Sequence, residues 1–169
     1  MERVYFSSHE SSIGTINFAS TERGLCRVLL PGESPSEMLA WLDRYIRPYE
    51  FLLGPEFNRE AAAQLAAYFA GQRRAFDLTL DLRGTPFQKR VWEELAKIPY
   101  GETRSYQDIA IRVGNAKACR AVGMANHANP LPIIIPCHRV IGKHGSLIGY
   151  GGGLDLKSKL LRLEGARWL

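Results

Sequence analysis

Cys137 and His138 are the adjacent residues of this chain best suited to covalent chemistry, because they place a thiol beside an imidazole. A thiol becomes a nucleophile when a base or a cation favours its thiolate form, whereas a buried thiol without such a neighbour is inert. Adjacent side chains of an extended segment point to opposite sides, so contact between these two requires a bend or a bridging water. From these residues alone, Cys137 fits a reactive cysteine and a core cysteine equally well.

The segment before these residues, 130–136, contains three prolines separated by leucine and isoleucine residues. Prolines fix the backbone, and the apolar side chains between them are expected to be buried, so the pattern predicts a rigid and largely dry pocket around Cys137. A metal site is the weaker interpretation, because Cys119 and His144 are isolated and no second Cys or His stands at ligand spacing. No metal is predicted.

Length and composition limit the class of protein. The 169 residues are 46% hydrophobic and 23% charged, which fits a folded globular chain and excludes disordered, collagen-like and coiled-coil proteins. The three cysteines (Cys26, Cys119 and Cys137) are an odd number without close pairing, so a reducing cytoplasm fits better than a disulfide framework. No signal peptide is expected, and the densest apolar run, 131–135, is too short to cross a membrane.

Positive charge is concentrated in the second half of the chain. Residues 1–83 carry nine Lys or Arg and eleven Asp or Glu, a net charge of −2. Residues 84–169 carry thirteen and six, a net charge of +7. A polyanion such as DNA is therefore expected to bind the second half only.

The first half, residues 1–83, is predicted to be a supporting α/β domain. Three strands at 4–8, 14–19 and 24–30 are expected to form an antiparallel meander, because short β-branched or aromatic runs are separated by turn residues. Helices are expected at 35–46 and 57–70, followed by one more strand or an extended linker at 76–82.

The second half, residues 84–169, is predicted to be a mostly helical domain, which makes the whole chain an α/β (α+β) protein. Its first helix is expected to begin after Thr85, an N-cap residue followed by proline. Short helices at 105–113 and 116–125, separated by Gly114, predict a helix-turn-helix, with an ordinary αα-hairpin as the alternative.

The helix at 116–125 consists mainly of small residues, with Lys117 and Arg120 as its only charges. Such a helix offers little to read base edges, but its backbone can approach a ligand closely. It therefore suits a shallow contact of low sequence specificity with DNA, with Arg120 as the one long probe. Tight packing in a core is the alternative interpretation.

A series of motifs runs through residues 85–169. It comprises Thr85-Pro86-Phe87-Gln88, Val91-Trp92, Ile98-Pro99-Tyr100-Gly101, Ser105-Tyr106, Arg120-Ala121-Val122-Gly123, Asn129-Pro130, Pro136-Cys137-His138-Arg139-Val140 and Gly152-Gly153-Leu154. In this order, the motifs resemble those of the O6-alkylguanine-DNA alkyltransferases, also called methylated-DNA–protein-cysteine methyltransferases. The first 83 residues are similar only in pattern to that family's variable N-terminal domain.

The resemblance implies a DNA repair protein that acts as a methylated-DNA–protein-cysteine methyltransferase. Such a protein binds double-stranded DNA in the minor groove and flips the damaged base into a pocket, because a stacked base is out of reach. It transfers the alkyl group of O6-alkylguanine, and of O4-alkylthymine, irreversibly to its own cysteine. Each molecule reacts once, as a monomer, without a cofactor.

The resemblance also assigns roles to the catalytic residues. Cys137 is the alkyl acceptor, His138 takes the thiol proton through a water, and Glu164 orients and charges the imidazole. If this relay keeps the sulfur as a thiolate, the proton must reside on His138, because Glu164 alone would disfavour a second negative charge. Asn129 is expected to hold the turn before the acceptor segment, and the Tyr106 hydroxyl to contact the flipped guanine.

Two further sets follow from the resemblance. The DNA-contact set is Arg120, Ala121, Gly123, Ser105, Lys117 and Asn126, in which Arg120 fills the space left by the flipped base. The base-pocket set is Tyr106, Val140, Tyr150, Gly151 and Gly152, with Tyr150 as a wall and Val140 contributing its backbone.

The chain departs from the family's pattern at two positions. Gly151 stands where a serine is often found, so one hydrogen bond to the guanine oxygen is expected from backbone alone. Asn126 stands where an apolar residue is often found, which predicts a more polar contact with the groove. Some relatives hold a structural zinc, but no matching Cys/His set surrounds Cys26 and His9, so none is predicted.

Three other functions compete with this interpretation. A non-catalytic protein that only recognises alkyl lesions in DNA would share the scaffold but lack the acceptor, and the presence of Cys137 argues against it. A transcriptional regulator that senses alkylation would need an additional domain. A cysteine hydrolase would turn over repeatedly and would not depend on DNA.

Overall fold

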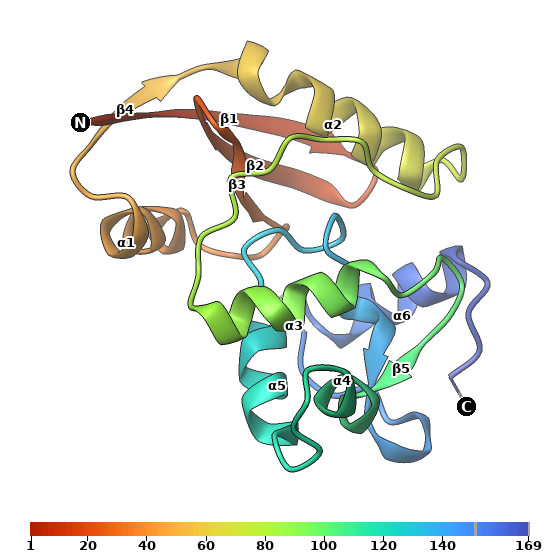
Figure 1. Cartoon of the computed structure of the whole chain (residues 1–169). Coiled ribbons are helices and arrows are strands. Elements are labelled where there is room, and N and C mark those ends of the chain that lie inside the picture. The colour runs from red at the N-terminus through yellow and green to blue at the C-terminus, as the bar shows by residue number, and fades with distance from the viewer. Residues whose placement is uncertain (151, 169) are drawn as a thin grey trace. The chain divides into compact units, whose positions relative to one another are not determined.

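The computed structural model of the chain describes residues 1–150 and 152–168. The chain divides into two compact units, an N-terminal unit (Met1–Arg83) and a C-terminal unit (Gly84–Leu169), which Figure 1 shows in red to yellow and in green to blue. The α+β fold class is confirmed, since a sheet with helices forms the first unit and helices dominate the second. Among the described residues, no helix combines the length and the apolar character needed to span a membrane.

The N-terminal unit contains a mixed four-stranded sheet with the order β3-β2-β1-β4. The strands are β1 (Glu2–Ser11), β2 (Gly14–Thr21), β3 (Gly24–Leu29) and β4 (Tyr49–Leu53). The meander of β1 to β3 is antiparallel, as predicted. Strand β4 was not predicted, and it pairs with β1 in parallel, so the expectation of a purely antiparallel sheet is corrected. Its short run, Tyr-Glu-Phe-Leu-Leu, follows a helix and lacks the alternation that identified the other strands.

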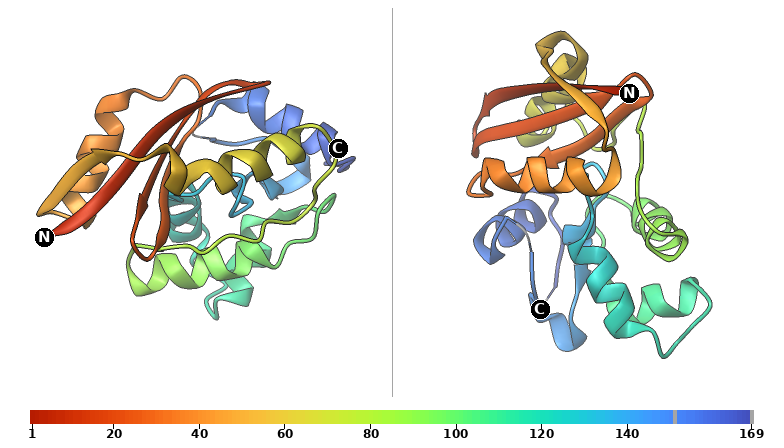
Figure 2. Two further views of the ribbon diagram at one scale, coloured as in Figure 1. Left: turned by 90° about the horizontal axis from the view of Figure 1, so that it is seen from above. Right: turned by 90° about the vertical axis from the view of Figure 1, so that its left-hand side faces the viewer.

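Two helices cover the sheet of the N-terminal unit on opposite faces, as Figure 2 shows. Helix α1 (Pro35–Tyr45) packs through Met38 and Leu42 on a cluster that includes Cys26. Helix α2 (Pro55–Phe69) is attached to the other face by Asn58, a fully buried residue. Its amide accepts a hydrogen bond from the Ser20 hydroxyl and donates to backbone and hydroxyl oxygens of β1.

The end of the N-terminal unit, residues 76–82, is extended and forms a single bridge between Leu80 and Leu25. Arg83 closes the unit with a fork of hydrogen bonds to the carboxylates of Asp81 (3.0 and 2.8 Å) and Glu2 (3.0 and 2.7 Å). Bidentate Arg–carboxylate pairs of this kind combine charge with a fixed geometry. The last residues of the unit are therefore fixed to its first strand.

The C-terminal unit begins with helix α3 (Pro86–Ala96), whose start follows from its sequence. Thr85 and Gln88 form a reciprocal capping box, with backbone N–H to side-chain oxygen distances of 3.1 and 2.9 Å. Val91, Trp92 and Leu95 are buried, as their helical spacing predicts. The Trp92 indole donates to the Ala125 carbonyl at 2.8 Å, which ties α3 to the third helix of the unit.

Helices α4 (Tyr106–Arg112) and α5 (Cys119–His127) pack on each other and on α3. Ser105 caps α4 as predicted, again in a capping box, here with Asp108. Helix α5 starts three residues later than the sequence indicated, so Lys117 lies in the connecting loop. Asn115 explains the delay, because its side chain accepts a hydrogen bond from the Lys117 backbone and holds a turn there.

After α5 the chain crosses the core of the C-terminal unit. A short helical turn, η1 (Cys137–Arg139), leads into strand β6 (Val140–Ile141), which pairs with β5 (Arg104–Ser105). A second turn, η2 (Lys143–Gly145), precedes helix α6 (Leu154–Leu163). Helix α6 packs against η1, so the end of the chain lies beside Cys137 and its neighbours.

Candidate active site

Cys137 opens the helical turn η1 and is 4% exposed. The turn corrects the expectation of an extended segment, in which Cys137 and His138 would point to opposite sides. Pro136 supplies the bend, and the Cys137 backbone N–H donates to the Ile135 carbonyl at 2.8 Å. A thiol in a tight, buried turn has few orientations, which suits an atom that must meet one carbon of a substrate.

Asn129 fixes the segment that delivers this cysteine. Its amide donates to the Ile135 carbonyl at 2.8 Å and accepts from the Leu131 N–H at 3.0 Å, so a single buried side chain closes the loop. Within the loop, Ile133 has a φ of 73°, which is strained for a β-branched residue. Such strain persists only where the surroundings enforce it, and it is frequent beside functional sites. The structure thus places Asn129 at the turn to which the resemblance assigned it.

His138 and Glu164 meet in the core of the C-terminal unit. His138 is fully buried, and its Nε2 lies 2.7 Å from Glu164 Oε2. An ionised carboxylate can only accept, so Nε2 carries the hydrogen and Nδ1 is left with a lone pair. The buried Nδ1 has no hydrogen-bond partner among the described residues. The ring is therefore oriented by the carboxylate and has one nitrogen available to take a proton.

The electrostatics of the site favour a neutral imidazole. Burial lowers the pKa of His138, and the charges of Arg139 and Lys157 lower it further, whereas the hydrogen bond and charge of Glu164 act in the opposite direction. The net lowering means that the ring is a base at neutral pH. It favours proton transfer during the reaction over the standing imidazolium that the relay suggested.

Arg139 is a site residue to which the sequence analysis gave no role. Its guanidinium binds both oxygens of Glu164, through Nε at 2.8 Å and Nη2 at 3.0 Å, and donates through Nη1 to the Ile98 carbonyl at 2.6 Å. Glu164 thus has a positive partner as well as the imidazole. In the sequence, the one indication of a role for Arg139 was its place in the Pro-Cys-His-Arg-Val motif. An arginine that follows a Cys-His pair does not by itself predict a buried ion pair with a distant glutamate.

Glu164 itself is positioned by the end of α6 and the loop after α3. The residue follows Leu163 as the C-cap of α6 and is 6% exposed. The Gly101 N–H donates to its Oε1 at 3.4 Å, and a Cβ on Gly101 would stand 3.0 Å from its backbone oxygen. Gly101 has a φ of 83°, so glycine suits both the turn and the close approach.

Lys157 is the second residue that sequence reasoning missed. It is fully buried, and its Nζ donates to the carbonyls of Val140 (2.7 Å) and Ile148 (3.1 Å). Burial lowers the pKa of this amine to about 8, while a negative charge on Cys137 acts in the opposite direction. Helical spacing could have revealed the residue, because Lys157 lies on the same face of α6 as the buried Leu160 and Leu161.

A pocket of about 770 Å³ opens between α4, α5 and the segment before α6. Its lining residues include Tyr106, Arg120, Gly123, Met124, Asn126 and Ile148. The Tyr106 hydroxyl donates to the Ile148 carbonyl at 3.2 Å, and burial raises its pKa, as would a negative charge on Cys137. The phenol therefore stays protonated and able to donate into the pocket, where it lies within electrostatic range of Cys137, a residue that is not itself part of the lining.

The six predicted DNA contacts occupy different environments. Arg120, Ala121 and Lys117 are exposed, and Gly123 is half-buried at the pocket. Ser105 is half-buried, with its hydroxyl engaged in capping α4. The expectation for Asn126 is corrected, because this side chain is buried and its amide donates to the Cys137 carbonyl at 3.4 Å. It contacts the acceptor residue from the inner side of α5 and does not extend from the helix surface.

The remaining base-pocket residues lie around the end of the acceptor segment. Val140 is buried, and its carbonyl is occupied by Lys157. Tyr150 and Gly152 are half-buried and do not line the pocket. Gly151 lies outside the described residues, so the predicted consequence of its replacing a serine stays a prediction.

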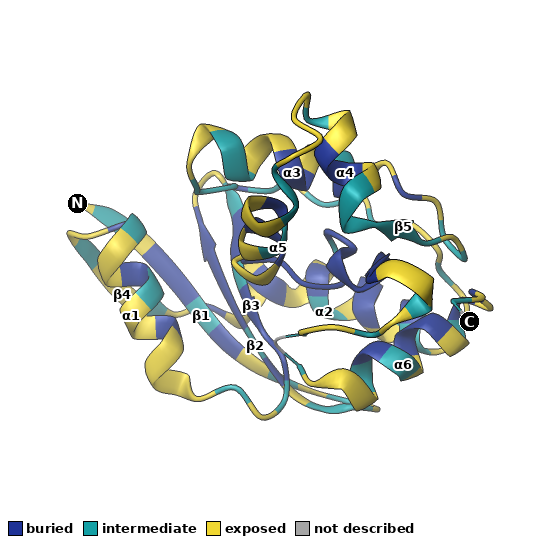
Figure 3. Cartoon of the chain, turned by 90° about the horizontal axis from the view of Figure 1, so that it is seen from below, coloured by how far each residue is buried: buried dark blue, intermediate teal, exposed yellow. Residues whose placement is uncertain are grey.

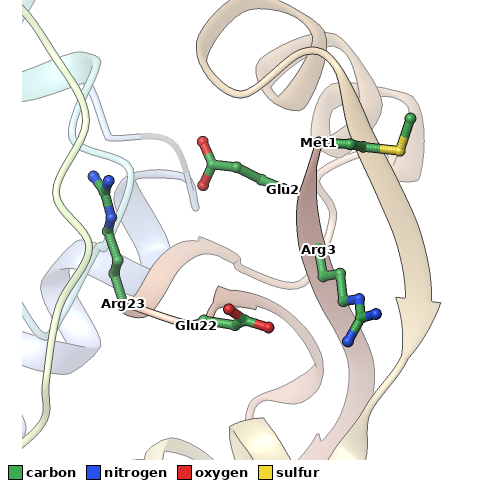
Figure 4. A pocket seen from close by; sticks show the side chains of 5 residues that line it. All are labelled: Met1, Glu2, Arg3, Glu22 and Arg23. Atoms are coloured by element: carbon green, nitrogen blue, oxygen red, sulfur yellow. The ribbon is translucent and has the colours of Figure 1, made fainter.

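Elsewhere among the described residues, the other buried cysteine and the other large cavity do not combine these groups. Cys26 donates to the Ala19 carbonyl at 3.3 Å, and burial raises its pKa to about 12. A second cavity, of about 600 Å³, is lined by the charged residues Glu2, Arg3, Glu22 and Arg23 together with Met1 (Figure 4). None of these five residues carries a thiol or an imidazole. Across the residues that the structure describes, no group of three or more His, Cys, Asp or Glu could hold a metal ion.

Comparison with family models matches both units of the chain. Residues 86–166 match the DNA binding domain of 6-O-methylguanine DNA methyltransferase. Residues 4–82 match the ribonuclease-like domain of the same protein family. The two matches meet at the division between the units.

Relatives are similar along almost the whole chain. The methylated-DNA–protein-cysteine methyltransferase of Methanosarcina acetivorans is 49% identical over 96% of this chain and 99% of its own length. The constitutive enzyme of Bacillus subtilis is 45% identical over 95% and 94%. The crystal structure of Mycobacterium tuberculosis OGT in complex with DNA has a TM-score of 0.82, at 44% identity over 96% of this chain and 92% of that one.

Proposed function

The chain belongs to the 6-O-methylguanine DNA methyltransferase family, a family of methylated-DNA–protein-cysteine methyltransferases that act in DNA repair, and we propose that Cys137 is its acceptor cysteine. The observation that carries the proposal is the buried set of Glu164, His138 and Cys137, in which a carboxylate orients the imidazole of the residue that directly follows the thiol. The other buried cysteine, Cys26, has no such neighbour.

The geometry supports a single displacement step. His138 Nδ1 takes the thiol proton, through a water as the resemblance implies, while Glu164 accepts the hydrogen of Nε2 and stabilises the imidazolium that forms. The sulfur attacks the alkyl carbon, the sulfur–carbon bond forms, and the carbon–oxygen bond breaks. The electron pair of the broken carbon–oxygen bond stays on the O6 atom of guanine. The proton held by His138 balances the negative charge that develops on the guanine. The thioether is stable, so each molecule reacts once.

The substrate in this proposal is O6-alkylguanine, and also O4-alkylthymine, in duplex DNA. A base must leave the stack to bring its alkyl carbon to a thiol that is 4% exposed. The pocket between Tyr106 and α5 is the place for the flipped base, where the phenol donates to it in exchange for the Ile148 carbonyl. Arg120, exposed at the rim, is placed to fill the gap in the duplex.

The proposal extends to the assembly and the compartment. The three residues of the relay all belong to the C-terminal unit, so a single copy suffices and the reacting species is a monomer. A thiol that must stay reduced requires a reducing compartment, which supports the cytoplasm as the place of action. The net charge of +7 on residues 84–169 is the expected source of salt-dependent affinity for DNA phosphates.

A mass measurement tests the proposed acceptor. The protein is incubated with a limiting and then an excess amount of duplex containing O6-methylguanine, and the intact protein and its peptides are weighed. We expect one methyl group per molecule, on the peptide that contains Cys137. Repeated turnover, or a methyl group on Cys26 or Cys119, would refute the proposal, and tight binding without any methyl transfer would favour the non-catalytic lesion-binding alternative.

A second measurement tests base flipping through Arg120. Replacement by alanine is expected to lower the ratio of the rate on duplex DNA to the rate on free O6-methylguanine, because a free base needs no extrusion. The ratio is measured from single-turnover rates at the same ionic strength. Equal slowing on both substrates would assign Arg120 to the chemistry and not to the duplex.

A further inference from the structure

Helix α5 carries one large apolar side chain on its outer face. Met124 is 74% exposed, while Val122 and Ala125 on the opposite face are buried. Figure 3 shows this division of α5 into an exposed and a buried side. A large apolar side chain that is mostly exposed, methionine in particular, is a frequent mark of an interaction surface.

The position of Met124 relates it to Arg120. The two residues are four apart, so one helical turn places them on the same face of α5. Both line the pocket of about 770 Å³, as do Tyr106 and Ile148 from other segments of the unit. Between them stand Ala121 and Gly123, which are small enough to let another surface approach the helix backbone. Met124 and Arg120 are therefore two long, exposed side chains at the pocket edge of α5, one apolar and one charged, with the exposed His127 one residue beyond Asn126 on the same lining.

We propose that Met124 is an apolar wedge that enters the minor groove beside Arg120 and packs against the bases that flank the flipped nucleotide. The proposal rests on the proposed function, because only an extruded base leaves such a gap. Extrusion exposes the apolar faces of the neighbouring bases to water, and the planar guanidinium of Arg120 can stack on such a face. An apolar side chain beside Arg120 would exclude water from the remaining apolar surface of the flanking bases. An unbranched thioether adapts to an irregular gap, and proteins that bind the minor groove use apolar side chains in this way.

Three substitutions of Met124 separate apolar character from length. Leucine keeps the apolar group, glutamine keeps the length but adds a polar amide, and alanine removes both. The readout is the ratio of the single-turnover rate on duplex O6-methylguanine to the rate on the free base. We expect the ratio to fall about tenfold for M124Q and M124A and less than threefold for M124L, in line with the loss of a partly buried apolar side chain. Leu53→Ala, which removes an 82% exposed leucine from the N-terminal unit, is the matched control and is expected to keep the ratio.

A fluorescence measurement gives a second readout that does not depend on methyl transfer. Duplex DNA with 2-aminopurine next to O6-methylguanine is bound by Cys137→Ala and by Cys137→Ala combined with Met124→Gln, each at saturation. A wedge changes the stacking of the flanking base, so the double variant is expected to give a smaller change in fluorescence. Circular dichroism and thermal unfolding establish that the variants are folded.

The outcomes distinguish the wedge from other roles. Unchanged ratios for M124Q and M124A would overturn the proposal, as would a ratio that falls for alanine but not for glutamine, because length alone would then matter. Equal slowing on duplex and free base would place Met124 in the base pocket and also overturn it. A wild-type protein that transfers no methyl group to Cys137 would refute the proposed function instead, which is a separate result.

Discussion

Each unit of the molecule contains an arginine that forms a bidentate pair with a carboxylate, but only the pair in the C-terminal unit also holds an imidazole. In the N-terminal unit, Arg83 binds Asp81 and Glu2. The Thr21 hydroxyl donates a hydrogen bond to the same carboxylate of Asp81. In the C-terminal unit, Arg139 binds Glu164, whose other contact is His138. The bridges themselves are similar in geometry. The difference is the group on the far side of the carboxylate.

The comparison shows what turns a structural ion pair into a chemical site. A hydroxyl such as that of Thr21 does not titrate near neutral pH, so the carboxylate of Asp81 can only hold the fold together. An imidazole changes its charge in that range, so the carboxylate of Glu164 controls a proton. Cys26 and Cys137 follow the same division: both are buried, but only the second is followed directly in the chain by a histidine.

The largest expected difference between the units concerns the two buried cysteines. Cys137→Ala should abolish methyl transfer, because Cys119, the other thiol at the pocket, hydrogen-bonds to Gln107 and does not adjoin the His138–Glu164 pair in the chain. Cys26→Ala should keep the wild-type rate. Single-turnover transfer from labelled duplex DNA measures both. Methyl transfer by the Cys137 variant, with the label on another residue, would show that Cys137 is not the only acceptor and would contradict this difference between the two cysteines.

The next difference concerns the two carboxylates. Glu164→Gln should slow transfer at neutral pH by up to about a hundredfold. This factor corresponds to a change of about two units in the pKa difference between the Cys137 thiol and the His138 imidazole. The slowing should shrink above about pH 8.5, where a thiolate forms without help. Asp81→Asn is the matched control and should leave the rate unchanged. Superimposable pH profiles from well-folded wild type and Glu164→Gln would show that Glu164 is only structural.

The third difference is the contribution of Arg139 and of Arg83 to the free energy of unfolding. Arg139→Met leaves the buried Glu164 without its cation and should lower the free energy of unfolding by about 3–5 kcal/mol. Arg83→Met should cost less, because Glu2 is 40% exposed and water can replace the arginine there. Urea unfolding followed by tryptophan fluorescence and circular dichroism measures both losses. Equal costs would mean that burial does not distinguish the two bridges.

The smallest expected effect is a difference in acid stability. The pKa of His138 is lowered by burial, so the unfolded chain binds the proton more readily and stability falls as the pH drops below about 6.5. In the N-terminal unit, hydrogen bonds from Arg83 lower the pKa of Glu2. Burial raises that of Asp81, but the hydrogen bonds outweigh it. Their contribution is present above the unfolded values near 4 and is lost below them.

Hydrogen exchange of amides in the two units, measured at successive pH values, follows this order. The C-terminal unit should lose protection first, between about pH 6.5 and 5. The N-terminal unit should follow only near pH 4. Simultaneous loss of protection in both units would indicate that the pKa shifts of these clusters do not control acid stability.

Local signals in the sequence determined most of the secondary structure. Thr85 and Ser105 predicted two helix starts, because capping depends on residues within one turn. The strands β1 to β3 followed from alternation and turn residues, which are also local. Strand β4 was not predicted, because its five residues form a strand only by pairing with β1, about 47 positions earlier in the chain.

The chemistry of the acceptor was also encoded locally, but its environment was not. The sequence placed a thiol next to an imidazole and, through the family resemblance, pointed to Glu164. The helical turn that holds Cys137 and His138, and the burial that lowers the pKa of His138, depend on packing of segments far apart in the chain. Arg139, Lys157 and Asn126 acquire their contacts in the same way. A side chain's residue type is fixed by sequence, whereas its partners and its exposure to water are decided only when α5, η1 and α6 pack around one core.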